Sequence, residues 1–416
     1  MNDTFKDYLL LRGARVLVLG ADAQEPVDGV RLLCNHRRAR GAAESLSAWL
    51  CSHGAHVTYL APKAHRLKER LPGATLLDTP AARAEDYLNT LTALKGDFDI
   101  AFQLARVPSL RACTPVRQKI KIASPSFKLA VEPNIELLAA LAARAPTFGY
   151  DLTQALKYLG PATPQSASWF TCLQHLTVDP PLEPPTEDVG GLPDLSGYHA
   201  IVTSGPTEEP VSVFGDALSN YSSGRQGHAV ALMLSRAGAK VSLVSGPASV
   251  VSAAHRNIET HYVQSAQEML FTVHHLLPAD IFVGVAAVAD FSPEALLREP
   301  LKEPCELKLG RNPDILKSVA ACRPRPRVVV GFAAETHAVE EYARGKLLAK
   351  GADLIVANCV GEAKAHMSSL LNQVKVVSAE GTRDYPLESK HHVAVRVVRE
   401  IHRRLKTSYG RPFLLA

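Results

Sequence analysis

Two loops in the second half of the chain, TSGPTEEP (residues 203–210) and SNYSSGRQG (residues 219–227), have residue types suited to binding a phosphate. The Ser-Ser-Gly run in the second loop precedes a predicted helix that begins near Arg225. A helix N-terminus presents free backbone N–H groups and the positive end of the helix dipole, and glycine lets a ligand approach the backbone closely. Serine is also a common helix N-cap, so this run alone would be weak evidence.

A further segment, VGVAAVADFSP (residues 283–293), places small residues at the end of a predicted strand and an aspartate directly after them. Ala286 and Ala287 would let a ligand lie against the backbone. Asp290 can accept hydrogen bonds or help to hold a cation. A buried strand followed by a solvated aspartate at a helix cap has the same pattern.

Four more positions in the last third of the chain could contact a nucleotide. Phe332 could stack on a base, although a single Phe after a strand usually belongs to the core. Lys346 and Lys350 lie four residues apart on one face of a predicted helix, where they could reach phosphates or form an ordinary solvated face. Asn358 ends a predicted strand, where its side chain could face a ligand.

The elements that position these residues alternate along the second half. Apolar runs predict strands at 199–204, 240–245, 281–285, 328–333 and 354–358. Amphipathic stretches predict helices at 225–237, 266–276, 313–321 and 338–350. A hairpin and a closing helix follow, at 374–389 and 390–406. This pattern predicts a Rossmann-like α/β fold, a mostly parallel sheet flanked by helices, which binds ligands at the carboxyl ends of its strands. Neither GxGxxG nor GxxxxGK[ST] is present, which disfavours the ordinary dinucleotide and P-loop sites.

The first half repeats parts of the second half in the same order. RVLVLGADAQEPVDG (residues 15–29) resembles AIVTSGPTEEPVSVF (residues 200–214), and the Glu-Pro pairs lie equally far ahead of Gly54 and Gly238. FKLAVEPNIELLAAL also matches ELKLGRNPDILKSVA. We interpret the chain as an internal duplication that forms two Rossmann-like domains arranged as an intrachain pseudo-dimer.

The predicted domains are a degenerate copy at residues 1–177, a linker at 178–197 and a second copy at 198–416. The linker is rich in proline, glycine and acidic residues and lacks apolar periodicity.

The amino-acid composition disfavours several classes of protein. The formal net charge of +5 is modest and dispersed, which suits anionic small substrates better than nucleic acid. Seven cysteines without a CxxC pair disfavour a disulfide framework or a zinc site. Without an apolar run of membrane-spanning length or a signal-peptide pattern, we expect a cytoplasmic protein that binds no membrane.

The ordered motifs of the second half together resemble the phosphopantothenoylcysteine synthetase family over about residues 198–405. The resemblance rests on Glu-Pro, Asn-x-Ser-Ser-Gly-x-x-Gly, Ala-Ala-Val-Ala-Asp, Asn-Pro-Asp-Ile, Gly-Phe-Ala-Ala-Glu-Thr, Lys-x3-Lys and Ala-Asn. It implies a ligase of coenzyme A synthesis that joins 4′-phosphopantothenate to L-cysteine. In this family the carboxylate of 4′-phosphopantothenate attacks the α-phosphate of a nucleoside triphosphate bound with Mg²⁺, so that an acyl-nucleotidylate forms and pyrophosphate leaves. The cysteine amine then attacks the acyl group, and nucleoside monophosphate is released.

The resemblance also implies which residues act. Asn220, Ala286, Ala287 and Asp290 match positions that contact the substrate, and Lys302 is the nearest match to a flap lysine; Asn220, Asp290 and Lys302 are the expected catalytic residues. The matched nucleotide-binding positions are Gly205, Ser223, Gly224, Gly227, Phe332, Lys346, Lys350 and Asn358. Motif details favour CTP over ATP. We expect no protein metal cage, with Mg²⁺ held by the nucleotide phosphates and Asp290 as its candidate protein ligand, and no flavin.

The two halves depart from the family pattern in complementary ways. The second half has Asp216 where the family has an arginine that serves the neighbouring subunit's site, whereas the first half keeps this arginine as Arg31. The first half also keeps a flap-like QKIKI, with Lys119. It has HRRARG in place of Ser-Ser-Gly, and Ser109 in place of the aspartate. We therefore hypothesise a monomeric chain with one working site, in the second half, to which Arg31 contributes a phosphate contact.

Two other classes of function remain open. A catalytically degenerate nucleotide-binding relative could act as a regulatory or partner subunit. A dinucleotide-dependent oxidoreductase could use a similar fold, although the glycine fingerprint is missing.

Overall fold

The computed structural model describes residues 12–35, 42–120, 122, 124–145, 147–149, 191–248, 255–335, 338–359 and 371–407. The chain divides into two compact units that are not continuous in sequence. Unit 1 contains the first half and two segments of the second half, 210–218 and 293–309. The predicted second domain, 198–416, therefore contributes to both units. Within the described residues, no helix is both long and apolar enough to cross a membrane.

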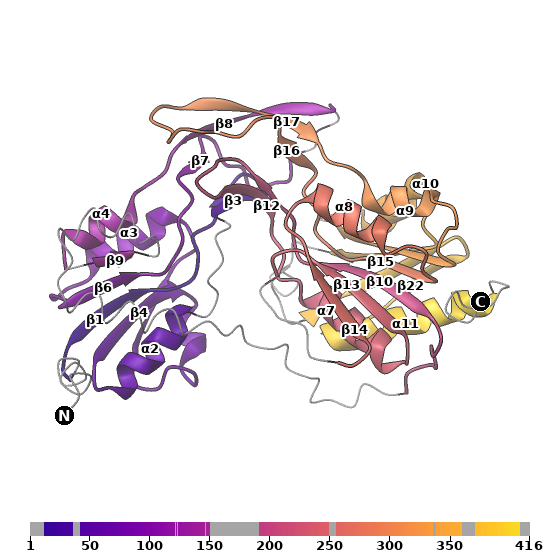
Figure 1. Cartoon of the computed structure of the whole chain (residues 1–416), viewed down its shortest axis with the longest axis horizontal. Helices are drawn as coiled ribbons and strands as arrows, with labels where there is room; N and C mark the ends of the chain where they lie inside the picture. The colour runs from indigo at the N-terminus through magenta and orange to yellow at the C-terminus, as the bar shows by residue number, and fades with distance from the viewer. Residues whose placement is uncertain are drawn as a thin grey trace. The chain divides into compact units, whose positions relative to one another are not determined.

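Unit 1 is built on a parallel five-stranded sheet in the order β5-β4-β1-β6-β9, which comprises β5 (Thr75–Thr79), β4 (His56–Pro62), β1 (Arg15–Leu19), β6 (Ile100–Gln103) and β9 (Thr147–Gly149). Alternate residues of β1 point to opposite faces, and each face has its own core. Val16 and Val18 pack with α2 (Ala42–Ser52), and Leu17 and Leu19 pack with α3 (Ala84–Ala93) and α4 (Leu137–Ala142). Figure 1 shows α2 on one side of this sheet and α3 and α4 on the other. A short 3₁₀ helix, η1 (Ala64–Leu67), follows β4.

Two smaller four-stranded sheets bring strands from both halves of the sequence together. One has the order β11-β12-β3-β2 and the other β16-β17-β8-β7. Their strands are β2 (Glu25–Pro26), β3 (Arg31–Asn35), β7 (Leu110–Ala112), β8 (Ser126–Pro133), β11 (Glu208–Pro210), β12 (Asp216–Asn220), β16 (Phe291–Pro293) and β17 (Cys305–Arg311). Residues 210–218 and 293–309 belong to unit 1 through these sheets.

Unit 2 contains an eight-stranded sheet in the order β14-β13-β10-β15-β18-β19-β21-β22. The first six strands run parallel to one another, β21 is antiparallel to β19, and β22 is antiparallel to β21. The strands are β10 (His199–Ser204), β13 (Lys240–Ser245), β14 (Ile258–Tyr262), β15 (Ile281–Gly284), β18 (Val328–Glu335), β19 (Leu354–Cys359), β21 (Val374–Ser378) and β22 (Gly381–Asp384). A separate pair joins β20 (Leu371–Asn372) to β23 (Glu388–Ser389).

Helices cover both faces of the unit 2 sheet (Figure 1). On one face, α7 (Arg225–Arg236) and α11 (Lys390–Thr407) pack on Val202, Val241 and Val283. On the other face lie α8 (Ala266–His275), α9 (Ile315–Ala321) and α10 (Val339–Lys350). The mixed α/β fold with a largely parallel sheet is confirmed, and the predicted strands and helices of this unit end within two residues of the observed bounds.

The Glu-Pro pairs of the two halves have the same local role. Glu209 accepts hydrogen bonds from the N–H of Ala266 at the start of α8 (2.9 Å) and from Thr207 Oγ1 (2.9 Å). Glu25 accepts one from the N–H of Ala84 at the start of α3 (2.9 Å). Burial raises the pKa of Glu209, and these donors counteract the shift. Each glutamate thus provides an acceptor for an otherwise free helix N–H group, which explains the repeated pair without a catalytic role.

Candidate nucleotide-binding site

Glycines allow two backbone segments to meet where β10 ends and α7 begins. Gly205 follows β10 with φ +74°, and Gly224 precedes α7 with the same positive φ, a conformation that L side chains rarely adopt. A Cβ on Gly224 would lie 2.5 Å from the Cβ of Ala248. One on Gly227 would lie 2.4 Å from Ser204 Oγ. Both positions therefore require glycine for steric reasons.

A small polar cluster fixes the first turn of α7 against β10. Ser204 Oγ donates a hydrogen bond to the carbonyl of Gly224 (2.9 Å). His228 Nδ1 lies 2.9 Å from Ser204 Oγ and 3.0 Å from the same carbonyl. Burial lowers the pKa of His228, so the imidazole is neutral at pH 7. These contacts hold the Ser-Ser-Gly turn in place before any ligand binds.

A pocket of about 150 Å³ lies at this turn, entirely within unit 2. It is formed by the ends of β10, β15, β18 and β19, the start of α7, and residues near β20 and α11. The pocket therefore lies at the carboxyl edge of the parallel strands, as the fold predicts. Of the predicted nucleotide- and substrate-binding residues, it brings together Gly205, Ser223, Gly224, Gly227, Ala286, Ala287, Phe332 and Asn358.

Asn220 is placed to hold the Ala-Ala-Val-Ala-Asp segment. Its Nδ2 donates to the carbonyl of Val288 at 2.9 Å and approaches that of Ala287 at 3.5 Å. Ala287 in turn donates its N–H to the carbonyl of Gly205 (2.9 Å). Asn220 and the exposed Asp290 do not line the pocket. The structure thus gives Asn220 a contact with the backbone that forms the pocket wall.

The predicted lysines lie elsewhere. Lys350 pairs with Asp314, whose carboxylate also caps α9 by accepting the N–H of Lys317 (3.0 Å). Neither Lys346 nor Lys350 lines the pocket. Lys302 is exposed and belongs to unit 1. No described residues form a group of three or more His, Cys, Asp or Glu able to hold a metal ion.

Arg31 is also part of unit 1, where it is only 3% exposed. Its Nη1 lies 2.5 Å from Asp28 Oδ2 and donates to the carbonyl of Ile120 at 3.3 Å. Asp28 further accepts the N–H groups of Val30 and Arg31. The arginine is therefore held in a defined conformation by its own hairpin.

Two residues that we predict to depart from the family pattern contact each other within unit 1. Asp216, predicted to stand at the arginine position of the second half, is fully buried. It accepts hydrogen bonds from the N–H (2.7 Å) and Oγ (2.5 Å) of Ser109, the residue at the aspartate position of the first half. Ser212 Oγ adds a third bond, at 2.7 Å. The two departures are thus complementary. The HRRARG segment, residues 36–41, lies outside the described residues.

Several residues that line the pocket were not predicted as binding residues from the sequence, among them Tyr221, Gln226, Asn372 and Lys390. Gln226 Nε2 donates to the carbonyl of Lys390 (3.0 Å), and Asn372 Nδ2 donates to Gln226 Oε1 (3.3 Å). Lys390 could have been noticed from the sequence, because it is the first residue of a helix, where the helix dipole disfavours a cation.

The largely parallel sheet and the pocket at the carboxyl edge of its parallel strands define an α/β protein with a candidate ligand site at the start of a helix. The family model described as DNA/pantothenate metabolism flavoprotein C-terminal domain matches residues 11–150 and 195–405. The chain belongs to this family.

Curated relatives are coenzyme A biosynthesis bifunctional proteins CoaBC. Those of Vibrio parahaemolyticus and Escherichia coli K12 are each 37% identical to it, over 50% of this chain and 53% and 52% of their own lengths. The Bacillus subtilis protein is 39% identical over 50% of this chain and 52% of its own length. The chain thus spans about half the length of the curated relatives it matches.

Two solved structures are also similar to part of this chain. The C-terminal domain of a CoaBC protein is 33% identical, with a TM-score of 0.44, covering 51% of this chain and 98% of that one. A Cab2 mutant in complex with phosphopantothenate-cysteine is 14% identical, with a TM-score of 0.43, covering 51% and 89%.

Proposed function

We propose that this chain is a phosphopantothenate–cysteine ligase of coenzyme A biosynthesis, driven by CTP or ATP. The observation that carries the proposal is the pocket in unit 2. Eight motif residues, from five separate stretches of sequence, line one cavity at the carboxyl edge of the sheet. Family membership and the CoaBC relatives support the same activity.

The proposed reaction has two steps. A carboxylate oxygen of 4′-phosphopantothenate attacks the α-phosphorus of the nucleotide, the bond to the bridging oxygen breaks, and pyrophosphate leaves. The amine of L-cysteine then attacks the acyl carbon, forms the amide and releases nucleoside monophosphate. Both steps depend on alignment and charge neutralisation rather than on a protein nucleophile.

The pocket residues have distinct proposed roles. The Ser-Ser-Gly turn and the N-terminus of α7 bind phosphate oxygens, and Gly205 and Gly227 let the phosphates approach the backbone. Phe332 packs against the base and Asn358 hydrogen-bonds to the nucleotide. Asn220 acts at least partly by positioning the backbone of Ala287 and Val288. Lys302, Lys346 and Lys350 remain proposed phosphate ligands on the sequence pattern alone.

Asp290 suits the proposed magnesium-bound nucleotide. Magnesium in such sites is commonly held by one or two carboxylates together with substrate phosphates and waters. Asp290 is exposed and follows the pocket-lining segment, so it can supply that carboxylate. When bound, Mg²⁺ would neutralise charge on the phosphates. We propose no flavin for this chain.

We further propose that Arg31 contacts the substrate phosphate of this single site, and that the duplicated halves act as a monomeric pseudo-dimer. The support is the complementary loss of motif residues, together with the Ser109–Asp216 contact inside unit 1. The shared strand order of β5-β4-β1-β6 and β14-β13-β10-β15 also favours a duplication.

Pyrophosphate release tests the function. We expect release from CTP, ATP or both when phosphopantothenate is present, and phosphopantothenoylcysteine when cysteine is added. Nucleotide binding without either product would instead support the degenerate regulatory relative. Binding of NAD(P) would favour the oxidoreductase class.

A further inference from the structure

Lys390 is a buried lysine in the pocket wall. It is 8% exposed and begins α11, the closing helix. It lines the same cavity as Ser223, Gly224 and Arg225, which form the start of α7. None of the sequence motifs includes it.

Three elements fix the backbone of Lys390 at this place. Gln226 of α7 donates to its carbonyl at 3.0 Å. Asn372 of β20 donates to the Gln226 amide oxygen at 3.3 Å. β20 pairs in turn with β23, which directly precedes Lys390. The lysine is therefore held at the pocket by hydrogen bonds from residues that also line it.

Positive charge converges on this cavity. The start of α7 contributes its dipole and N–H groups, Arg225 lies on the same wall, and Lys390 stands at the positive end of α11. Burial, and secondarily the charge of Arg225, lower the pKa of Lys390 to about 8. These charges and N–H groups would attract a polyanion that enters the cavity.

We infer that Lys390 binds the phosphate chain of the nucleoside triphosphate and neutralises its charge opposite the Ser-Ser-Gly turn. This inference rests on the proposed function and assigns a residue that the family motifs leave out. It also supplies a cation inside the pocket, whereas Lys346 and Lys350 do not line it. The site is thus expected to discriminate by phosphate number, with triphosphates binding best.

Calorimetric titration with CTP, ATP and CMP tests the inference on the full chain. Lys390→Met removes the charge at nearly constant length, and the matched control is Lys406→Met, an exposed lysine on the same helix. We expect Lys390→Met to weaken triphosphate binding about tenfold or more, with a smaller effect on CMP, because a charged contact is lost. Lys406→Met should bind like the unaltered chain.

The outcomes separate the two proposals. Unchanged triphosphate affinity in a Lys390→Met protein with an unchanged unfolding midpoint would overturn the role of Lys390 alone. Failure of the unaltered, folded chain to bind either triphosphate would overturn the proposed function and this inference with it.

A measurement on the unaltered chain decides the case if Lys390→Met does not fold. Between pH 7.5 and 9.5, above the ordinary range of histidine and below that of tyrosine, Lys390 loses its proton while Arg225 keeps its charge. Triphosphate affinity should fall several-fold across this range. A flat profile would contradict the inference.

Discussion

Gly227 illustrates how a single missing side chain shapes the site. Glycine inside a helix normally lowers stability relative to alanine, so its presence in the first turn of α7 needs a reason. The reason is Ser204, whose Oγ, Cβ and Cα would lie 2.4, 2.6 and 3.0 Å from an added Cβ. The helix approaches β10 closely enough to bring its N-terminus to the pocket.

We predict that Gly227→Ala displaces the start of α7 and weakens triphosphate binding about tenfold or more, because helix N–H groups act only at hydrogen-bond distance. Gly345→Ala is the matched control, since Gly345 lies within α10 and an added Cβ would meet nothing within 4 Å. That change should stabilise the protein by about 0.5–1 kcal/mol. Titration calorimetry and thermal unfolding measure both effects, and equal nucleotide affinity in the two variants would contradict the account.

Residue types and spacing predicted eight of the seventeen residues that line the pocket. Gly205, Ser223 and Asn358 were among them because they lie where a strand ends or a helix begins. Lys390 could not be predicted in the same way. In KHHVAVRVVREIHRRLK it is simply the first of many basic residues, and its burial depends on Gln226 and Asn372, which are distant in sequence. Tertiary packing alone distinguishes it from an exposed lysine.

Among the secondary-structure elements, apolar runs predicted correctly those strands that are buried in the sheet. β10 and β13 match their predicted bounds because nearly every residue in them is apolar or fully enclosed. β14, IETHY, was missed because it is a partly exposed edge strand without an apolar run. β12 and β17 were missed because they pair with strands of the first half, which no local pattern reveals.

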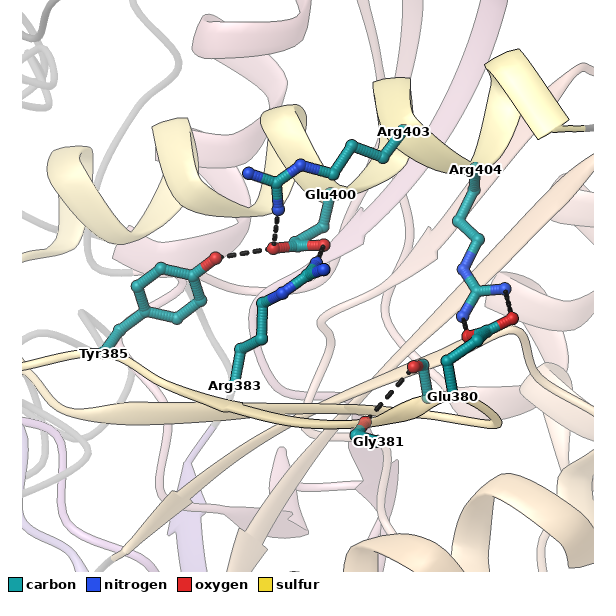
Figure 2. Close-up of polar contacts among 8 residues, drawn as sticks. Glu380, Gly381, Arg383, Tyr385, Glu400, Arg403 and Arg404 are labelled. Atoms are coloured by element: carbon teal, nitrogen blue, oxygen red, sulfur yellow. Dashed lines mark hydrogen bonds and ion pairs between the residues drawn. The ribbon is translucent and has the colours of Figure 1, made fainter.

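The closing helix is tied to the β21–β22 hairpin region through one buried carboxylate, as Figure 2 shows. Glu400 of α11 is 4% exposed and accepts hydrogen bonds from Tyr385 Oη (2.6 Å), Arg383 Nη1 (2.6 Å) and Arg403 Nη1 (2.5 Å). Arg404 of the same helix pairs with Glu380, which is largely exposed. The two ion pairs thus differ mainly in burial.

We predict that Glu400→Ala lowers stability by about 1.5–3 kcal/mol, because a hydroxyl and two guanidinium groups that are more than half exposed lose a charged hydrogen-bond acceptor. Glu380→Ala, the exposed control, should cost less than about 1 kcal/mol. Since α11 carries Lys390, the first change should also weaken nucleotide binding. Thermal unfolding would show the difference, and similar midpoints for the two variants would contradict this view of the helix.

For the molecule as a whole, the proposed duplication would explain why one half keeps motif residues that the other half lacks. The strand orders β5-β4-β1-β6 and β14-β13-β10-β15 correspond, and Glu25 and Glu209 each cap a helix of their own half. Asp216 and Ser109, which we predict to stand where the family has an arginine and an aspartate, hydrogen-bond to each other. We interpret the first half as a copy that has lost its own site and retained a supporting role.

This interpretation predicts different effects at two equivalent positions. Arg31→Ala should raise the KM for phosphopantothenate about tenfold or more, the loss expected for one charge-assisted phosphate contact of about 1.5–3 kcal/mol. Asp216→Ala should lower the unfolding midpoint, because Ser109 and Ser212 lose a buried acceptor, but leave this KM unchanged. Steady-state kinetics decides the matter. An unchanged KM in folded Arg31→Ala would refute the role of Arg31.

The proposed ligase activity is tested most directly by pyrophosphate release from the full chain with Mg²⁺, phosphopantothenate and either CTP or ATP. We expect release that depends on phosphopantothenate, followed by formation of phosphopantothenoylcysteine when L-cysteine is added. Absence of pyrophosphate with both nucleotides, from folded protein, would contradict it.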